Sequence, residues 1–180
     1  LRRVFDRLGG GDLRIQAILI AFCFGGLLEA LAGFGAPVAI TATMILSLGV
    51  KPLKAAVTVL IANTAPVAFG AVAVPITTAA DVGGKDAHVI ATIVGHQAPF
   101  LAMLVPLILL VILDGMKGLK DAWLPALVIG VSFAIAQWVT AATPAYNLTD
   151  VVACIVSMGV AVVFLQFWKP RGVAGVRERY

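Results

Sequence analysis

Hydrophobic residues fill most of this chain in long stretches, and charged residues are confined to short islands between them. The islands are Arg2–Arg14, Lys51 with Lys54, Asp81–Asp86, Asp114–Asp121, Asp150 and Lys169–Arg179. The stretches between them approach the roughly 20 residues that a helix needs to cross a bilayer. The pattern therefore predicts an all-α polytopic membrane protein whose helices end at the charged islands.

The basic residues also predict the orientation of the chain, because Lys and Arg in short loops favour the cytoplasmic side of a membrane. We expect residues 1–14 to form a cytoplasmic lead-in and residues 169–180 a cytoplasmic basic tail. Between residues 51 and 168 the pattern predicts about four transmembrane helices joined by short loops. Their expected ranges are 55–80, 87–113, 122–143 and 150–168.

The first hydrophobic stretch, residues 15–50, does not fit a plain pair of crossings. It must leave the cytoplasmic side and return to it, yet Gly33-Phe34-Gly35 divides it into two short arms. An arm of about 15 residues from Ala36 to Val50 reaches only about 22 Å, against about 30 Å for the hydrocarbon core. We expect a broken helix or re-entrant hairpin over residues 15–50, with two marginal full crossings as the alternative.

Glu29 is the one carboxylate between Ile15 and Val50, and it lies just before this break. An acidic side chain at bilayer depth costs roughly 2.5 to 3.5 kcal/mol, so it marks a functional site that faces a cavity or a partner. We assign Glu29 a proton-coupling role, in which its protonation removes the repulsion of an incoming anion. The alternative is structural, with Glu29 permanently hydrogen-bonded to backbone groups that the break exposes.

The dipeptide Ala-Pro occurs inside each of the first three hydrophobic segments, directly after glycine or polar residues. The three sites are Gly35-Ala36-Pro37, Asn63-Thr64-Ala65-Pro66 and Gly95-His96-Gln97-Ala98-Pro99. Proline disfavours helical backbone in the residue before it, and the first turn of a new helix tolerates it. Each site can therefore start a half-helix within the membrane whose free N–H groups attract an anion. Alternatively, the prolines kink the helices for packing alone.

These breaks define a candidate site for a small anionic substrate. The substrate-binding residues that we expect are Gly33, Phe34, Gly35, Ala36, Pro37, Asn63, Thr64 and Gln97. His96 lies beside the third break, and it joins Glu29 as a candidate proton-coupling residue.

Composition and motifs disfavour several other classes of protein. Hydrophobic residues make up 61% of the chain and charged residues 12%, against roughly 25% charged in a soluble domain. The net charge of +4 does not indicate a nucleic-acid partner, because the basic residues flank apolar stretches. No paired nucleophile and base, metal-ligand spacing or phosphate loop is visible, so we expect no enzyme, cofactor or metal site. A non-transporting subunit of a membrane complex stays an alternative.

Several ordered runs of the sequence are distinctive. They are GGLLEALAGFGAPVAITA at 25–42, LGVKPL at 48–53, IANTAPVAFG at 61–70, Pro75-Ile76 and SFAIAQ at 132–137. Together they strongly resemble the bacterial L-lactate permease family, and the similarity covers essentially the whole chain. Family members are considerably longer, so the resemblance implies that this chain is a partial one.

The resemblance also implies a function and a location. It implies a multi-pass permease of the bacterial cytoplasmic membrane that imports lactate, and often glycolate, together with a proton. The implied partners are the substrate, the proton, the lipid bilayer and a second set of membrane segments of the same permease, with an oligomer left open. The alternative is a carrier of another small carboxylate that is coupled to sodium.

Overall fold

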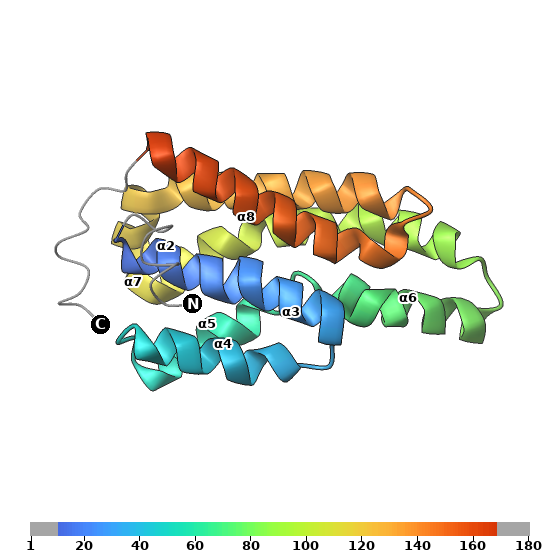
Figure 1. Cartoon of the computed structure of the whole chain (residues 1–180), viewed down its shortest axis with the longest axis horizontal. Helices are drawn as coiled ribbons and strands as arrows, with labels where there is room; N and C mark the ends of the chain where they lie inside the picture. The colour runs from blue at the N-terminus through green and yellow to red at the C-terminus, as the bar shows by residue number, and fades with distance from the viewer. Residues whose placement is uncertain (1–10, 169–180) are drawn as a thin grey trace.

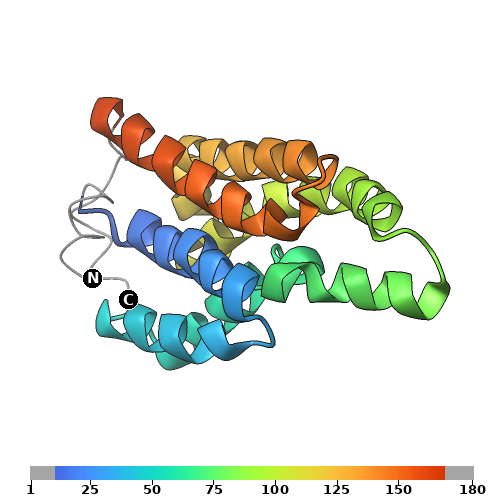
Figure 2. The same cartoon turned by 45° about the vertical axis from the view of Figure 1, so that its right-hand side comes forward.

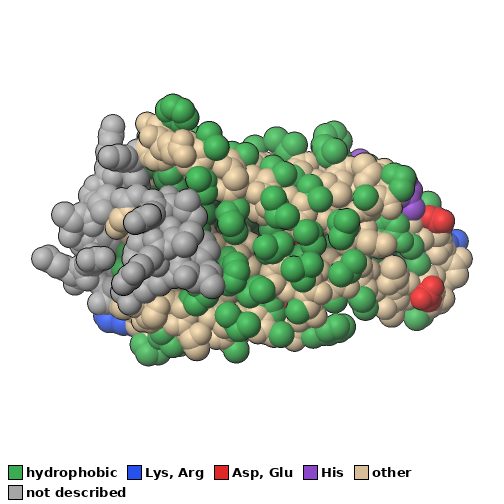
Figure 3. Space-filling view, in the orientation of Figure 1, with side chains coloured by type: hydrophobic (Ala, Val, Ile, Leu, Met, Phe, Trp, Pro, Cys, Tyr) green, Lys and Arg blue, Asp and Glu red, His purple; other side chains and the backbone are tan. Residues whose placement is uncertain are grey.

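The computed structural model of the protein describes residues 11–168, and every regular element within that range is helical. Residues 1–10 of the expected lead-in and the expected tail at 169–180 lie outside the described residues. The helices run mostly along the long axis of an elongated bundle (Figure 1). On the face seen in Figure 3, hydrophobic side chains cover the middle and charged side chains appear only toward the two ends.

One apolar helix of 20 residues runs through the bundle. It consists of α2 (Leu13–Ile18), a π-helical segment η1 (Leu19–Phe24) and α3 (Gly25–Ala32). Asp12 begins it as an N-cap, because its carboxylate accepts a hydrogen bond from the Arg14 backbone N–H at 2.8 Å. The segments η1 and α3 pack against two further helices, α4 (Ala36–Ser47) and α8 (Thr149–Phe167).

The chain turns back sharply after α3. Gly33, Phe34 and Gly35 all have positive φ, at 65°, 55° and 76°, a conformation that glycine adopts without steric cost. α4 (Ala36–Ser47) then returns beside α3 and η1, with Pro37 in its first turn as predicted. The tip of this hairpin stops short of the far end of the bundle, which α6 (Gly70–Gly83) and α7 (Ala87–Ala141) reach (Figure 1).

The second predicted break is present as well. α5 (Pro52–Ala62) ends before it, and the chain continues through a short 3-10 helix, η2 (Val67–Phe69), into α6 (Gly70–Gly83). The helical segments on the two sides of the break are bent by 60° relative to each other. The pair is long and apolar enough to cross a membrane only when it is taken together as one broken span.

This break extends further than the sequence indicated. Ala71, Val72 and Ala73 have φ angles of 47°, 57° and 63°, so they form one left-handed turn at the start of α6. The right-handed helix resumes after them, which places Pro75 close to its beginning. A proline is tolerated there because the first N–H groups of a helix have no partner within it.

The third predicted break, at Gly95–Pro99, is wrong. Within α7 (Ala87–Ala141) the backbone is non-helical only at Asp114, Gly115 and Ala122. Pro99 is therefore an ordinary helix-interior proline, which removes one backbone hydrogen bond without ending the helix. Gly95 packs directly against Ala141, so the contact with the returning arm holds this part of the helix in place.

The non-helical residues of α7 fold it into a hairpin of two antiparallel arms (Figure 2). Gly95 and Met103 of the first arm lie against Ala141 and Gly130 of the second, which fixes the register. After η3 (Tyr146–Leu148), α8 (Thr149–Phe167) runs back along this hairpin. The two arms and α8 lie close to the residue ranges expected for the last three crossings. Among the described residues, three helices are long and apolar enough to span a membrane: Leu13–Ala32, Ala87–Ala141 and Tyr146–Phe167.

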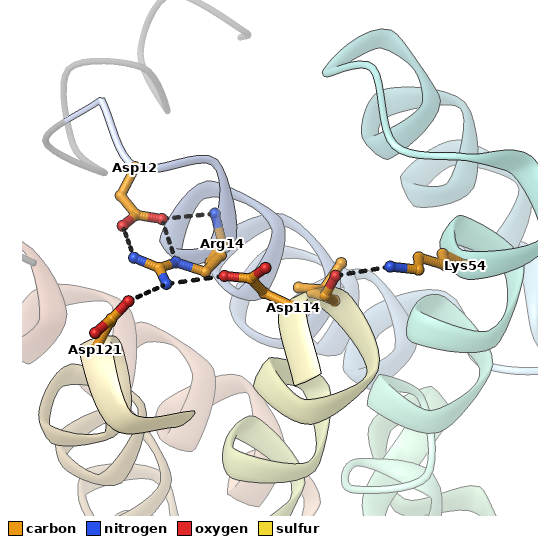
Figure 4. A network of polar contacts seen from close by, with 6 residues as sticks. Asp12, Arg14, Lys54, Asp114 and Asp121 are labelled. Atoms are coloured by element: carbon orange, nitrogen blue, oxygen red, sulfur yellow. Dashed lines mark hydrogen bonds and ion pairs between the residues drawn. The ribbon is translucent and has the colours of Figure 1, made fainter. Parts of the chain in front are cut away.

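A buried cluster of charges ties the start of α2 to the turn of the α7 hairpin (Figure 4). Arg14 is fully buried and pairs with Asp12 at 2.8 Å, Asp114 at 3.1 Å and Asp121 at 3.4 Å. Lys54 of α5 donates to a backbone carbonyl of the same turn, that of Leu113, at 3.1 Å. The sequence pattern presented Arg14 as one of several loop charges, whereas the folded chain uses it inside the protein.

Candidate functional site

The two observed breaks meet at a small cavity beside Glu29. Its volume is about 180 Å³, which is room for about six groups the size of a water molecule. The residues that line it are Glu29, Gly33, Phe34, Val67, Gly70, Ala71 and Pro75. The α3–α4 hairpin and the α5–α6 break therefore line one cavity together, an arrangement known from transporters with discontinuous helices.

Glu29 is almost completely buried at this cavity, with 5% of its surface exposed. Its Oε2 accepts a hydrogen bond from the backbone N–H of Gly35 at 3.3 Å. Its Oε1 lies beside Gly70, close enough that a Cβ on that glycine would be 3.3 Å from the oxygen. The acid thus touches the tip of the hairpin on one side and the start of α6 on the other.

The contact between the two breaks is very tight. A Cβ added at Gly33 would lie 2.5 Å from the Cβ of Ala71, so no side chain fits there. Ala71 itself belongs to the left-handed turn, a conformation that costs an L-residue roughly 1–2 kcal/mol. Strained backbone of this kind persists where the surrounding structure holds it, and it is frequent at ligand sites.

The amino end of α4 has fewer free N–H groups than we expected. Ala36 N–H donates to the Gly33 carbonyl at 3.3 Å and Val38 N–H to the Gly35 carbonyl at 3.1 Å. Pro37 has no N–H, and the Gly35 N–H points to Glu29. These bonds are long, at the upper end of the usual range. An anion would therefore have to compete with Glu29 for the Gly35 N–H.

Asn63 and Thr64 lie at the end of α5, and neither lines the cavity. Asn63 is half-buried, whereas Thr64 is exposed and its hydroxyl donates back to the Ile61 carbonyl at 2.7 Å. This bond closes the last turn of α5, so Thr64 serves the helix that ends here and not the one that follows.

His96 and Gln97 lie on an exposed face of α7, outside the Glu29 cavity. The His96 Nδ1 is 2.6 Å from the Thr92 carbonyl on the preceding turn, and its ring meets Trp138 edge-on with centroids 6.2 Å apart. Together with Trp138, His96 lines a separate groove of about 380 Å³ that is almost entirely apolar. The structure therefore brings Glu29 together with Gly33 and Phe34 but not with His96.

Sequence reasoning missed part of the site. Val67, Gly70 and Ala71 line the cavity, yet they look like ordinary members of an apolar helix. The available signal was Pro75, because a proline nine residues after Pro66 indicates that a second helix start follows the first break. Among the described residues, no group of three or more His, Cys, Asp or Glu side chains could hold a metal ion.

The described residues include three helices long and apolar enough to span a membrane, and a buried acid lies where two helix breaks meet. These features define a polytopic membrane protein, and they are typical of transporters built from broken helices. The sequence model described as L-lactate permease matches residues 8–179. The chain therefore belongs to the L-lactate permease family, and this membership indicates a transporter and not an enzyme.

Curated relatives agree with this assignment. The chain is 50% identical to the glycolate permease GlcA of Escherichia coli (strain K12) over 160 residues, which cover 89% of the chain and 29% of the relative. It is 49% identical to the L-lactate permease of Bacillus subtilis (strain 168), over 89% of the chain and 28% of the relative. The L-lactate permease of Escherichia coli (strain K12) is 46% identical, over 88% and 29%. The chain thus spans less than a third of the length of these relatives. No solved structure matches the chain.

Proposed function

We propose that this chain is part of a permease that imports L-lactate or glycolate across the bacterial cytoplasmic membrane together with a proton. The observation that carries the proposal is the position of Glu29, which is buried where two helix breaks meet and bonded to the tip of one of them. Relatives named as lactate and glycolate permeases support a small hydroxycarboxylate as the substrate.

The contact between Glu29 and Gly35 suggests how a proton and an anion favour each other. While Glu29 is ionised, it occupies the Gly35 N–H and repels a second carboxylate at the same place. Protonation removes the repulsion and weakens the hold on that N–H, because hydrogen bonds to charged groups are roughly twice as strong as neutral ones. A substrate carboxylate can then take over the Gly35 N–H. Each ligand thus increases the affinity for the other.

The exposed tip of the hairpin supports a site shared with the rest of the permease. Phe34 is 87% exposed, although it lies at the loop that stops within the bundle, and Leu31 and Val67 near it are exposed as well. Lipid can cover exposed apolar side chains, but the cavity beside them contains Glu29, and an acid at membrane depth faces protein or water and not lipid. We assign the cover of this cavity to further membrane segments of the permease, and we place the Arg14 end of the bundle on the cytoplasmic side.

The test is uptake of labelled lactate by the intact permease in proteoliposomes. We expect uptake to rise with an inward proton gradient, to be competed by glycolate and to be unchanged when sodium is replaced by choline. Dependence on sodium instead of the proton gradient would contradict proton coupling. Absence of any uptake by correctly folded protein would contradict the transport of these acids.

Two variants locate the proton-coupling group. Glu29→Gln should bind or exchange lactate but lose the response to an imposed proton gradient, because glutamine cannot carry the proton. His96→Gln serves as the matched control, since His96 lies on another face. If only His96→Gln loses the response, the coupling role belongs to His96. If Glu29→Gln keeps coupling but loses folded yield, the role of Glu29 is structural.

A further inference from the structure

A second buried carboxylate lies outside the Glu29 cavity, between the α7 hairpin and α8. Asp150 in the first turn of α8 and Gln137 in the second arm of α7 are both fully buried. Gln137 Nε2 donates to Asp150 Oδ1 at 2.8 Å. Asp150 also faces the backbone N–H of Phe69, next to the start of α6. An acid that the sequence placed at a charged turn is therefore part of the protein interior.

Two polar atoms of this pair have no hydrogen-bond partner among the described residues, Asp150 Oδ2 and Gln137 Oε1. With the acid ionised, both atoms are acceptors, so neither can satisfy the other. A buried polar atom without a hydrogen bond destabilises the fold, because it has lost its bonds to water and gained none in return. One proton on Oδ2 would turn that atom into a donor for Oε1. A neutral acid and an amide then pair through two antiparallel hydrogen bonds.

We propose that Asp150 and Gln137 form a buried proton-binding site, in which Asp150 Oδ2 carries the proton and donates it to Gln137 Oε1. Proton binding forms one O–H bond at Oδ2 and removes the negative charge of the carboxylate; the proton comes from a hydronium ion, which leaves as water. The site is separate from Glu29, and its existence does not depend on which substrate the permease carries.

The described residues around Asp150 favour the neutral acid because they provide no positive charge to pair with a carboxylate. Among the described residues, no Lys, Arg or His bonds to Asp150. Its titratable neighbours are thiols, Cys154 one turn later in α8 and, beyond it, Cys23 of η1. The amino end of α8 favours an anion, but this effect is modest. Burying a carboxylate without a positive partner costs more than the amino end of the helix returns, which favours the neutral acid.

The Asp150 site lies next to the same helix break as Glu29, the break between α5 and α6. Asp150 faces Phe69, and Glu29 lies beside Gly70, so two acids flank successive residues of the same break. Any rearrangement of the η2–α6 break would change the surroundings of both. The proton affinity of Asp150, like that of Glu29, should therefore depend on the conformation of α6.

The test is infrared spectroscopy of the intact permease in lipid at neutral pH, without substrate. A protonated carboxyl group has a C=O stretch that is well separated from the bands of an ionised carboxylate. We expect Asp150→Asn to remove one such band, and Gln137→Leu to shift it, because the O–H···O bond is lost. Asp81→Asn at an exposed position is the control, and it should leave this region of the spectrum unchanged.

Asp150→Asn suits this test because asparagine reproduces the hydrogen bonds of a neutral acid, with N–H donated to Gln137 Oε1. Should it fail to fold, wild-type protein with ¹³C-labelled aspartate answers the question, since a protonated aspartate gives a shifted C=O band. Two results would overturn the proposal: loss of an ionised-carboxylate band, instead of a protonated one, in Asp150→Asn, or the absence of any protonated aspartate in the labelled wild-type protein. So would a carboxylate band at Asp150 that changes between sodium and choline, because it would indicate a metal cation in place of the proton.

Discussion

Arg14 at the start of α2 and Asp114 at the turn of the α7 hairpin are 100 residues apart in the chain, yet their side chains pair at 3.1 Å. Asp12 and Asp121 contact the same guanidinium group. Arg14 is completely buried. The three carboxylates stabilise its positive charge there, and the guanidinium group in turn stabilises the negative charges of the aspartates. The cluster therefore fixes the position of α2 relative to the turn of the α7 hairpin.

Replacing Arg14 by Met should destabilise the permease by about 3–5 kcal/mol, the usual cost of leaving buried charges without their partner. The matched control is Lys51→Met, because Lys51 is exposed and should tolerate the change. The measurement is the fraction of intact permease that stays monodisperse after heating in detergent. Equal stability of the two variants would contradict a structural role for the cluster.

Gly33→Ala should prevent the α3–α4 hairpin from packing against α6. The added methyl group would overlap Ala71, and the positive φ of 65° adds a further cost of roughly 1–2 kcal/mol. Gly49→Ala isolates the second effect, since Gly49 has φ of 98° but open space around it. We expect uptake to be lost in Gly33→Ala and largely kept in Gly49→Ala. Comparable uptake by both variants would argue against the contact of the two breaks.

Local backbone chemistry explains which parts of this fold were predictable. The break at Gly33–Gly35 could be predicted because two glycines and a following proline act on their own residues, whatever surrounds them. At Gly95–Pro99 the same signal was wrong, since contact with Ala141 on the distant second arm favours an unbroken helix. The left-handed turn at Val72 was invisible for the opposite reason, because Ala and Val have no local preference for positive φ.

The polar residues differ in the same way: those whose position depends on nearby sequence could be predicted, and those whose position depends on distant contacts could not. Glu29 could be identified because an acid in an apolar segment stands out in the sequence. Its contact with Gly35 was also foreseeable, since the two lie six residues apart across the break. The pairing of Gln137 with Asp150 depends on how α8 packs against α7, and the sequence alone carries no signal for that register.

Gly130→Ala and Gly159→Ala should have opposite effects, although both glycines lie in helices. A Cβ at Gly130 would overlap the backbone carbonyl of Met103 in the other arm of α7, and backbone cannot move aside easily. A Cβ at Gly159 meets nothing within 4 Å. Alanine there should stabilise α8 by up to about 1 kcal/mol, from helix propensity alone. Thermal unfolding of the purified permease distinguishes the two, and a neutral Gly130→Ala would argue against the close contact of the arms.

Val72→Gly should make the permease more stable, which is unusual for a glycine introduced into a hydrophobic segment. Val72 has φ of 57°, a left-handed conformation that costs an L-residue roughly 1–2 kcal/mol. Glycine adopts this conformation without that cost. Val74 is the matched control, because the two side chains are 41% and 40% exposed and only Val72 is among the residues with positive φ. Val74→Gly should therefore destabilise by about 1 kcal/mol, the ordinary penalty of glycine in a helix. Thermal unfolding measures the change in stability of each variant. Lactate uptake shows whether transport requires the strained turn: if the turn must open during the transport cycle, Val72→Gly should slow uptake by stabilising the closed turn. If both variants lose stability equally, the left-handed turn does not exist in the membrane.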